Sequence, residues 1–92
     1  MAKLNIPTPL RVYTNGQSEF TVSNTTVKGA LDELVIAFPA LKQHIFKDSG
    51  ELRPFVNLFK GKENITFLQG LDTTIREDDI LRIIPSIAGG GF

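Results

Sequence analysis

The sequence predicts a small α+β domain in which a mixed β-sheet of about four to five strands packs over one main helix and one short helix. Segments that alternate polar and apolar residues occur towards both ends of the chain, and one segment between them carries its apolar residues at helical spacing. The length of 92 residues allows one domain with one modest core. Packing a single apolar helical stripe onto a sheet is an economical way to build that core.

The N-terminal part of the chain predicts two strands joined by a turn. Residues 3–6 alternate and form the first strand, and the two prolines that follow interrupt its hydrogen bonding, so a bulge or an edge position is expected there. Residues 10–13 are expected to continue this strand. The Asn15-Gly16 pair is a strong signal for a hairpin turn, and residues 19–23 alternate again. Together these segments predict an N-terminal hairpin.

The main helix is predicted by one apolar stripe. Residues 24–26 form an Asn-Thr-Thr run that supplies candidate N-caps. Five apolar residues then fall at helical spacing: Val27, Leu31, Leu34, Val35 and Phe38. The charged residues fall on the opposite face, which is predicted to be solvated: Lys28, Asp32 and Glu33. Pro39 ends this helix, because the residue before a proline disfavours helical backbone angles.

The second half of the chain predicts a short helix and three more strands. The short helix turns Leu41 and Ile45 inward and is closed by a loop at residues 47–50. The strands are predicted at residues 55–60, 65–67 and 80–84. Turns at 61–64 and 77–79 and an irregular segment at 68–75 connect them. This order, a hairpin followed by a helix and further strands, is the β-grasp or ubiquitin-like arrangement.

Composition excludes several classes of function. Ten Lys and Arg residues balance ten Asp and Glu residues, which argues against a nucleic-acid binder. The chain has no cysteine and a single histidine, His44, so it offers no disulfide, thiolate metal site or cysteine nucleophile. Its longest apolar run, residues 34–38, is too short to span a membrane. The N-terminus lacks the apolar region of a signal peptide, so a cytoplasmic location is expected. The Asp78-Asp79 pair is interpreted as a solvated turn.

The chain ends in Ala88, Gly89, Gly90, Gly91 and Phe92. Consecutive glycines supply no core material, but they form a thin strip of backbone that can enter a narrow active site where any Cβ would clash. A frayed terminus is the alternative. We expect a β-grasp domain over residues 1–87 and a flexible tail over residues 88–92.

Several segments of the chain resemble the ThiS/MoaD family of ubiquitin-like sulfur carriers. They are residues 6–11 (Ile-Pro-Thr-Pro-Leu-Arg), 55–59 (Phe-Val-Asn-Leu-Phe), 65–73 and 83–90, where Pro-Ser-Ile-Ala leads from the last strand into Gly-Gly. The length and the Phe-Leu-Gln-Gly-Leu-Asp-Thr run at 67–73 look closest to the carriers for cysteine or homocysteine biosynthesis. The small subunits of molybdopterin synthase are a close competitor, and a ubiquitin-like modifier conjugated to lysines is a third reading.

The resemblance implies a covalent substrate rather than an enzyme. In this family an E1-like enzyme uses ATP to convert the carboxylate of the second glycine, Gly90 here, into an acyl-adenylate. Sulfur then replaces AMP to give a thiocarboxylate, which donates its sulfur to an acceptor enzyme such as a PLP-dependent cysteine or homocysteine synthase. The chain itself is expected to bind no cofactor and no metal. A small residue at the reacting carbonyl leaves access for both ATP and the sulfur nucleophile.

The sequence departs from the family pattern because Gly91 and Phe92 follow the diglycine. While they are attached, the carbonyl of Gly90 is held in a peptide bond. The chain as written is therefore expected to be a precursor, trimmed by a JAMM-type zinc metalloprotease like some of its relatives. The expected cut lies after Gly90, and a cut after Gly91 is the alternative.

A docking surface is predicted near the root of the tail. If Leu81 and Ile83 face the helix, then Arg82 and Ile84 share the outer face of the last strand. Phe59 is expected beside them on the neighbouring strand, where aromatic and arginine side chains suit an interface. In the alternative interpretation these are ordinary strand positions covered by residues 68–75.

Overall fold

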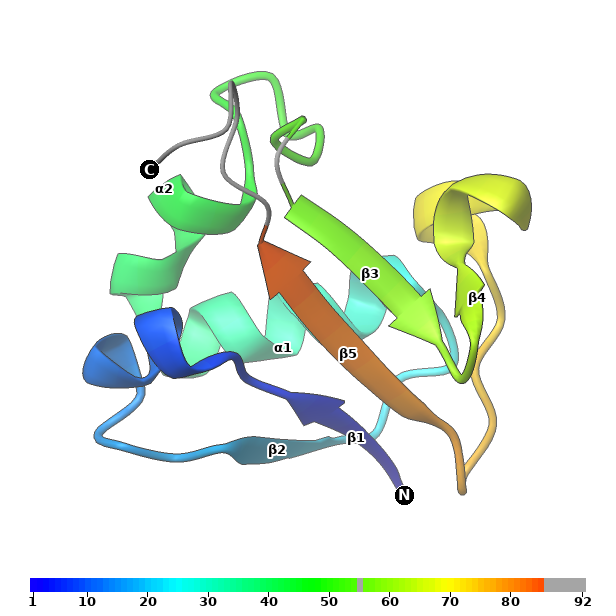
Figure 1. The fold of residues 1–92 in the computed structure, drawn as a ribbon, viewed down its shortest axis with the longest axis horizontal. Coiled ribbons are helices and arrows are strands. Elements are labelled where there is room, and N and C mark those ends of the chain that lie inside the picture. The colour runs from blue at the N-terminus through cyan, green and yellow to red at the C-terminus, as the bar shows by residue number, and fades with distance from the viewer. Residues whose placement is uncertain (55, 86–92) are drawn as a thin grey trace.

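The computed structural model describes residues 1–54 and 56–85 and confirms the predicted α+β, β-grasp architecture. Its five strands are β1 (Ala2–Asn5), β2 (Glu19–Val22), β3 (Val56–Lys60), β4 (Glu63–Asn64) and β5 (Ile80–Pro85). They form one mixed sheet in the order β2-β1-β5-β3-β4. The two central strands, β1 and β5, run parallel, and the other neighbours are antiparallel. Helix α1 (Val27–Ala37) lies across one face of this sheet (Figure 1).

The core lies between α1 and the sheet. From the helix it takes Val27, Ala30, Leu31 and Leu34, and from the two central strands it takes Leu4, Leu81 and Ile83. Val35 and Phe38, the other two members of the predicted stripe, are partly buried against this core. The predicted inward positions of the main helix and of the last strand are thus confirmed.

Helix α1 begins and ends where the sequence predicts. Thr26 is the N-cap, and its side-chain oxygen accepts a hydrogen bond from the Gly29 N–H at 3.1 Å. The helix ends at Ala37, with Phe38 as the C-cap before Pro39. A 3₁₀ turn, η2 (Pro39–Leu41), leads into the short helix α2 (Lys42–Ile45). Leu41 and Ile45 are fully buried, as expected.

The predicted solvated face of α1 is only partly correct. Lys28 and Asp32 form an exposed ion pair at 2.9 Å. Glu33 instead holds the chain that leaves β2: its carboxylate accepts hydrogen bonds from the backbone N–H groups of Ser23 at 3.0 Å and Asn24 at 2.9 Å, and from both side chains. Partial burial alone would raise the pKa of the Glu33 carboxyl, but the hydrogen bonds from Asn24 and Ser23 outweigh it and lower the pKa.

The expectation that residues 10–13 continue the first strand is wrong. Residues Thr8–Tyr13 form a 3₁₀ helix, η1, which starts after Pro7 with a proline in its first turn. Asn15 and Gly16 do make a turn with positive φ angles of 57° and 82°, closed by Gln17 N–H on the Thr14 carbonyl at 3.1 Å. That turn follows η1, so β1 and β2 pair antiparallel through a long connection rather than a tight hairpin.

The predicted short strand at residues 65–67 is also wrong. Ile65–Phe67 is a 3₁₀ turn, η3, which buries only the Ile65 side chain. Asn64 caps it by accepting the Thr66 N–H at 2.9 Å. The residues that pair with the end of β3 are Glu63 and Asn64, which the sequence placed in a turn. The segment predicted as irregular contains one further 3₁₀ turn, η4 (Gly70–Asp72), with Gly70 at a φ of 58°.

Candidate functional site

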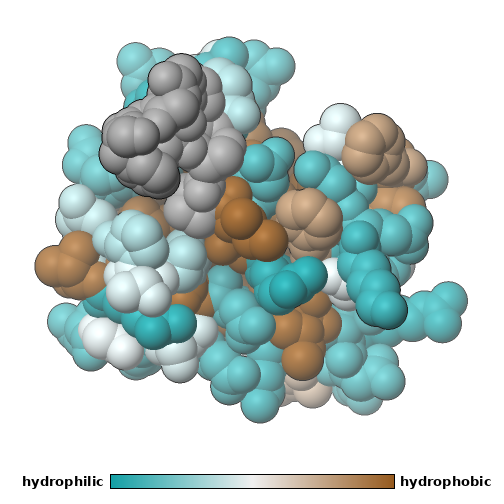
Figure 2. All heavy atoms as spheres, in the orientation of Figure 1, coloured by the Kyte–Doolittle hydropathy of each residue, from teal (hydrophilic) through white to brown (hydrophobic). Residues whose placement is uncertain are grey.

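Strand β5 separates a buried face from an exposed one. Leu81 and Ile83 are 0% and 3% exposed beneath α1, whereas Ile80 and Ile84 are 45% and 39% exposed on the other face. Arg82 is exposed between these two isoleucines. Figure 2 shows this face of the molecule, where apolar surface over β5 and β3 is interrupted by hydrophilic side chains.

Phe59 and Arg82 form the centre of the exposed face. They are register partners across the antiparallel β3–β5 pair, and the Arg82 guanidinium lies 5.8 Å from the centroid of the Phe59 ring. The same guanidinium donates a hydrogen bond to the Gly61 carbonyl at 3.0 Å. Within the described part of the chain, no carboxylate lies within ion-pair distance of Arg82. The arginine is therefore held by the Phe59 ring and the Gly61 carbonyl, and no carboxylate of the described residues compensates its charge.

The predicted patch Phe59, Arg82 and Ile84 is brought together on one face. Ile84 lies two residues beyond Arg82 on β5, opposite Asn57 in the register. Residues 68–75 leave Arg82 and Ile84 exposed, and Phe59 is half-buried. Leu71 of that segment instead lines a cleft together with Leu58 and Ile65, whose side chains are buried. The patch is accessible and lies where β5 leads towards the C-terminus; its use as a docking surface stays a prediction.

Polar residues beside the patch have structural partners. Lys60 donates to the Thr74 carbonyl at 2.9 Å and lies 3.6 Å from the Asp79 carboxylate. Asp79 also accepts the Arg76 N–H at 2.7 Å, which closes the turn before β5. Among the residues described, no group of three or more His, Cys, Asp or Glu side chains could hold a metal ion.

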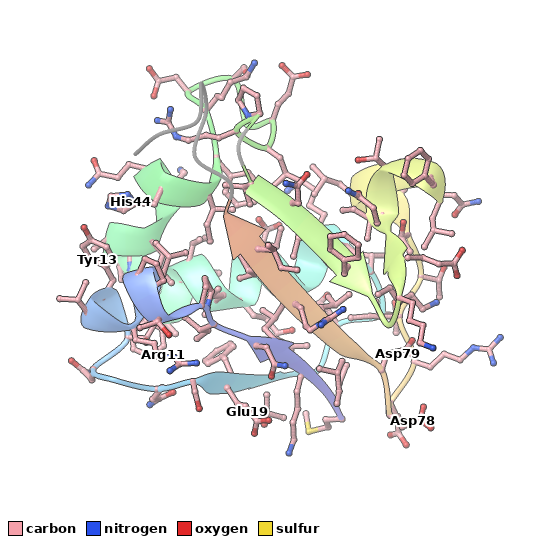
Figure 3. All side chains as sticks on the ribbon, viewed as in Figure 1. Arg11, Tyr13, Glu19, His44, Asp78 and Asp79 are labelled. Atoms are coloured by element: carbon pink, nitrogen blue, oxygen red, sulfur yellow. The ribbon has the colours of Figure 1, made fainter. Side chains whose placement is uncertain are left out.

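The single histidine lies elsewhere. His44 on α2 stacks on Tyr13 of η1 with ring centroids 4.4 Å apart. Figure 3 shows this pair at the side of the molecule opposite Asp78 and Asp79. The histidine and the tyrosine therefore do not share a site with these two aspartates. The Nε2 atom of His44 is buried without a hydrogen-bond partner within residues 1–54 and 56–85. Sequence reasoning did not anticipate the stack, since it depends on the 3₁₀ helix that replaces the expected strand.

The tail residues fall outside the described part of the chain. These are the predicted sulfur-bearing Gly90, its neighbours Ala88 and Gly89, and the two residues expected to be removed, Gly91 and Phe92. The boundary between domain and tail at residues 87 and 88 falls there as well.

In the described ranges, no helix has the length and apolar character needed to cross a membrane.

Comparison with known proteins places this chain and its fold in a family. The sulfur carrier protein CysO of Mycobacterium tuberculosis is 33% identical over 89 residues, which cover 95% of this chain and 96% of that protein. Small archaeal modifier protein 1 of Haloferax volcanii is 36% identical over 67 residues, covering 73% of this chain and 72% of that protein.

The solved structures agree with the sequence relatives. A chain in the crystal structure of the Amycolatopsis orientalis BexX/CysO complex superposes with a TM-score of 0.88 at 29% identity, covering 98% of this chain and 100% of that one. The ThiS family matches residues 4–90. With nearly its whole length matched, the chain belongs to the ThiS family.

Proposed function

We propose that this chain is a sulfur carrier that acts as a covalent substrate of partner enzymes. The observation that carries the proposal is the likeness, over almost the full length of both chains, to a Mycobacterium tuberculosis protein named as a sulfur carrier. The family match also runs through residue 90, the second glycine of the Gly-Gly pair that follows the last strand. Removal of Gly91 and Phe92 would leave Gly90 with a terminal carboxylate beside another glycine.

The proposed chemistry takes place at the carboxylate of Gly90. Its oxygen attacks the α-phosphate of ATP on an E1-like enzyme, which forms the acyl-adenylate and releases pyrophosphate. Hydrosulfide then attacks the acyl carbon, a C–S bond forms as the C–O bond to AMP breaks, and the product is the thiocarboxylate. In this proposal the folded domain is recognised by the enzyme and the tail carries Gly90 into its active site. The enzyme supplies the catalytic groups, so the chain itself acts as the substrate.

Gly91 and Phe92 must be removed before Gly90 can react. The family match ends at residue 90, which supports a cut after Gly90 rather than after Gly91. A JAMM-type zinc metalloprotease is the proposed processing enzyme. The cleavage adds water across the Gly90–Gly91 bond and produces the carboxylate that the activating enzyme requires.

The Phe59–Arg82–Ile84 patch is the proposed contact with the activating enzyme. It combines an aromatic ring, an exposed aliphatic side chain and an arginine without a carboxylate partner in the described chain. Such a surface suits a partner that offers an apolar pocket beside an acidic side chain. A relative has been crystallised in a complex named BexX/CysO, which supports the formation of a complex with a second protein. The proposed sulfur acceptor is a PLP-dependent enzyme of cysteine or homocysteine synthesis.

One observation favours a second candidate function. The likeness to small archaeal modifier protein 1 of Haloferax volcanii extends over 67 residues. A modifier would use the same adenylated glycine, but a lysine amine would attack the acyl carbon and form an isopeptide bond. The two functions share the activation step and differ in the product.

Intact-mass measurement tests the proposal. The chain ending at Gly90 is incubated with the activating enzyme, ATP and a sulfur donor, and is expected to gain the mass difference between sulfur and oxygen. The full chain should remain unmodified until the protease removes Gly91 and Phe92. Addition of lysine-bearing proteins distinguishes the modifier, because conjugates then appear at higher mass. Sulfur loading of the full chain with Phe92 still attached would refute the precursor, and failure of the trimmed chain to react would refute the carrier.

A further inference from the structure

We propose that Asn15 is a site of spontaneous deamidation, and that the turn between η1 and β2 controls the rate of this modification. Asn15 is the one asparagine in the chain that precedes a glycine; the other four precede Ile, Thr, Leu and Ile. Asn15 and Gly16 are both exposed, and beyond the chain neighbours of Gly16 nothing lies within 4 Å of the place where its Cβ would be. The proposal does not depend on the sulfur-carrier function.

The reaction needs only these two residues and water. The backbone nitrogen of Gly16 attacks the side-chain carbonyl carbon of Asn15, so that a new C–N bond forms and the bond to the side-chain nitrogen breaks. Ammonia leaves with the proton of the Gly16 N–H, and a five-membered imide remains. Water then adds to one of its two carbonyls: addition at the side-chain carbonyl gives aspartate, and addition at the main-chain carbonyl gives isoaspartate. Because glycine has no side chain, nothing obstructs the attack.

The folded turn restrains the attacking nitrogen. The Gly16 N–H donates a hydrogen bond to the Arg11 carbonyl at 2.8 Å. The φ angles of Asn15 and Gly16, 57° and 82°, hold both residues in the left-handed region, which asparagine and glycine tolerate. Attack on the side chain requires that the Gly16 N–H first leaves the Arg11 carbonyl. The reaction therefore proceeds from the fraction of molecules in which the turn has opened locally.

Thr14 keeps this turn closed. Its side chain is fully buried although the two residues that follow it are exposed. Its hydroxyl lies 2.9 Å from the Gln17 carbonyl and 3.2 Å from the Arg11 carbonyl, and it can donate its single proton to one of them at a time. The Gln17 N–H in turn donates to the Thr14 carbonyl at 3.1 Å. Opening the turn breaks these bonds, so the hydroxyl of Thr14 lowers the population of the reactive form.

Modification of Asn15 should also change the contact between η1 and α2. An isoaspartate inserts one extra carbon into the main chain between residues 15 and 16, so the hydrogen bonds across the turn cannot all keep their geometry. The 3₁₀ helix η1 ends at Tyr13, directly before this turn, and the Tyr13 ring stacks on His44 of α2 with centroids 4.4 Å apart. The modified turn is therefore expected to loosen the end of η1 that carries this ring.

Peptide mapping of the full chain after incubation at mildly alkaline pH tests the proposal. Asn15 should gain the mass difference between a hydroxyl and an amino group, as a mixture of aspartate and isoaspartate, while the other four asparagines remain unchanged over the same period. The chain unfolded in guanidinium chloride should react at Asn15 faster than the folded chain, because the Gly16 N–H is then free. An Asn15 that stays intact in the unfolded chain, or reacts equally fast in both states, would overturn the proposal.

Two threonine variants separate opening of the turn from unfolding of the whole domain. Thr14→Val removes the hydroxyl and should speed the modification of the folded chain roughly two- to tenfold, as expected for the loss of one hydrogen bond. Thr73→Val is the matched control, because Thr73 is the other buried polar residue among those described and its hydroxyl oxygen accepts the Gln69 N–H at 3.1 Å, beside η4. It should leave the rate unchanged. Both are measured where circular dichroism shows a folded chain. Equal acceleration in the two variants, or none in Thr14→Val, would show that this turn does not control the reaction.

Discussion

The two faces of strand β5 differ in what their side chains do. On one face, Leu81 and Ile83 are buried beneath α1 and contribute to folding. On the other, Arg82 and Ile84 are exposed, and Arg82 is fixed by the Phe59 ring and the Gly61 carbonyl. A strand with a two-residue period can therefore carry a core on one side and a recognition surface on the other. Substitutions on alternate residues should separate stability from binding.

The largest effect is expected on the buried face. Leu81→Ala removes a fully buried side chain at the centre of the sheet and should lower the free energy of unfolding by about 2–5 kcal/mol. Urea denaturation followed by circular dichroism measures this loss. Under conditions where the variant is folded, its rate of adenylation should match that of the unsubstituted chain. A folded Leu81→Ala variant that is poorly adenylated would show that the two faces are not independent.

A reversed charge on the exposed face should affect binding more than folding. Arg82→Glu is expected to reduce adenylation by the activating enzyme roughly tenfold, because a carboxylate then faces an acidic partner surface. The free energy of unfolding should fall by no more than about 1 kcal/mol, since an exposed cation–π contact contributes about 0.5–1 kcal/mol. Steady-state kinetics with the trimmed chain provide the measurement. An unchanged rate would remove the patch from the proposed interface.

A substitution of Glu33 should lower the stability of the domain on the side of α1 while leaving β5 unchanged. Glu33→Gln replaces the carboxylate that accepts the Ser23 and Asn24 N–H groups, and should cost roughly 1 kcal/mol after allowance for solvent exposure. The lowered pKa of Glu33 means that its contribution is present above the pKa of the unfolded chain and is lost as the pH falls through the folded-state pKa.

The pH dependence gives this prediction its control. The difference in unfolding free energy between the unsubstituted chain and Glu33→Gln should be largest at neutral pH. It should become smaller in acid, as Glu33 is protonated. Urea denaturation at pH 7 and pH 3, below the ordinary pKa of about 4.3 for a glutamate, makes the comparison. A difference that stays constant over this range would mean that the carboxylate charge is not responsible. Adenylation at neutral pH should be unaffected.

The smallest effect is expected at the far end of the exposed face. Ile80 is 45% exposed on the same side as Ile84 but lies at the start of β5. Ile80→Ser should change the free energy of unfolding by no more than about 0.5 kcal/mol, as is usual for surface substitutions. It should also leave adenylation unchanged if the partner binds near the C-terminal end of the strand. A rate as low as that of Arg82→Glu would extend the interface along the whole strand.

The sequence predicted the elements with a clear period. The stripe of α1 and the inward positions of β5 follow from spacing alone, and the structure places them as expected. The N-cap, Thr26, is one of the three candidates that the Asn-Thr-Thr run offered. The outward positions of the exposed Arg82 and Ile84 and of the half-buried Phe59 were also found this way, because they alternate with buried positions.

The errors lie in segments too short to show a period. Residues 10–13 and 65–67 contain apolar residues that fit a strand or a 3₁₀ turn equally well, and each turn buries one of them, Leu10 or Ile65. The role of Glu33 was missed for another reason: its partners lie nine and ten residues earlier, on a segment that approaches α1 only after the chain folds. Local pattern gives no signal for such a contact.

The position of β5 has a consequence for how the chain is made. This strand joins β1, near the start of the chain, to β3, and among the strands that the structure describes no other connects the β2–β1 pair to the β3–β4 pair. A nascent chain that stops before residue 80 therefore holds two unconnected pieces of sheet with open edges, a state prone to aggregation. The two pairs can therefore form one sheet only after β5 has been synthesised.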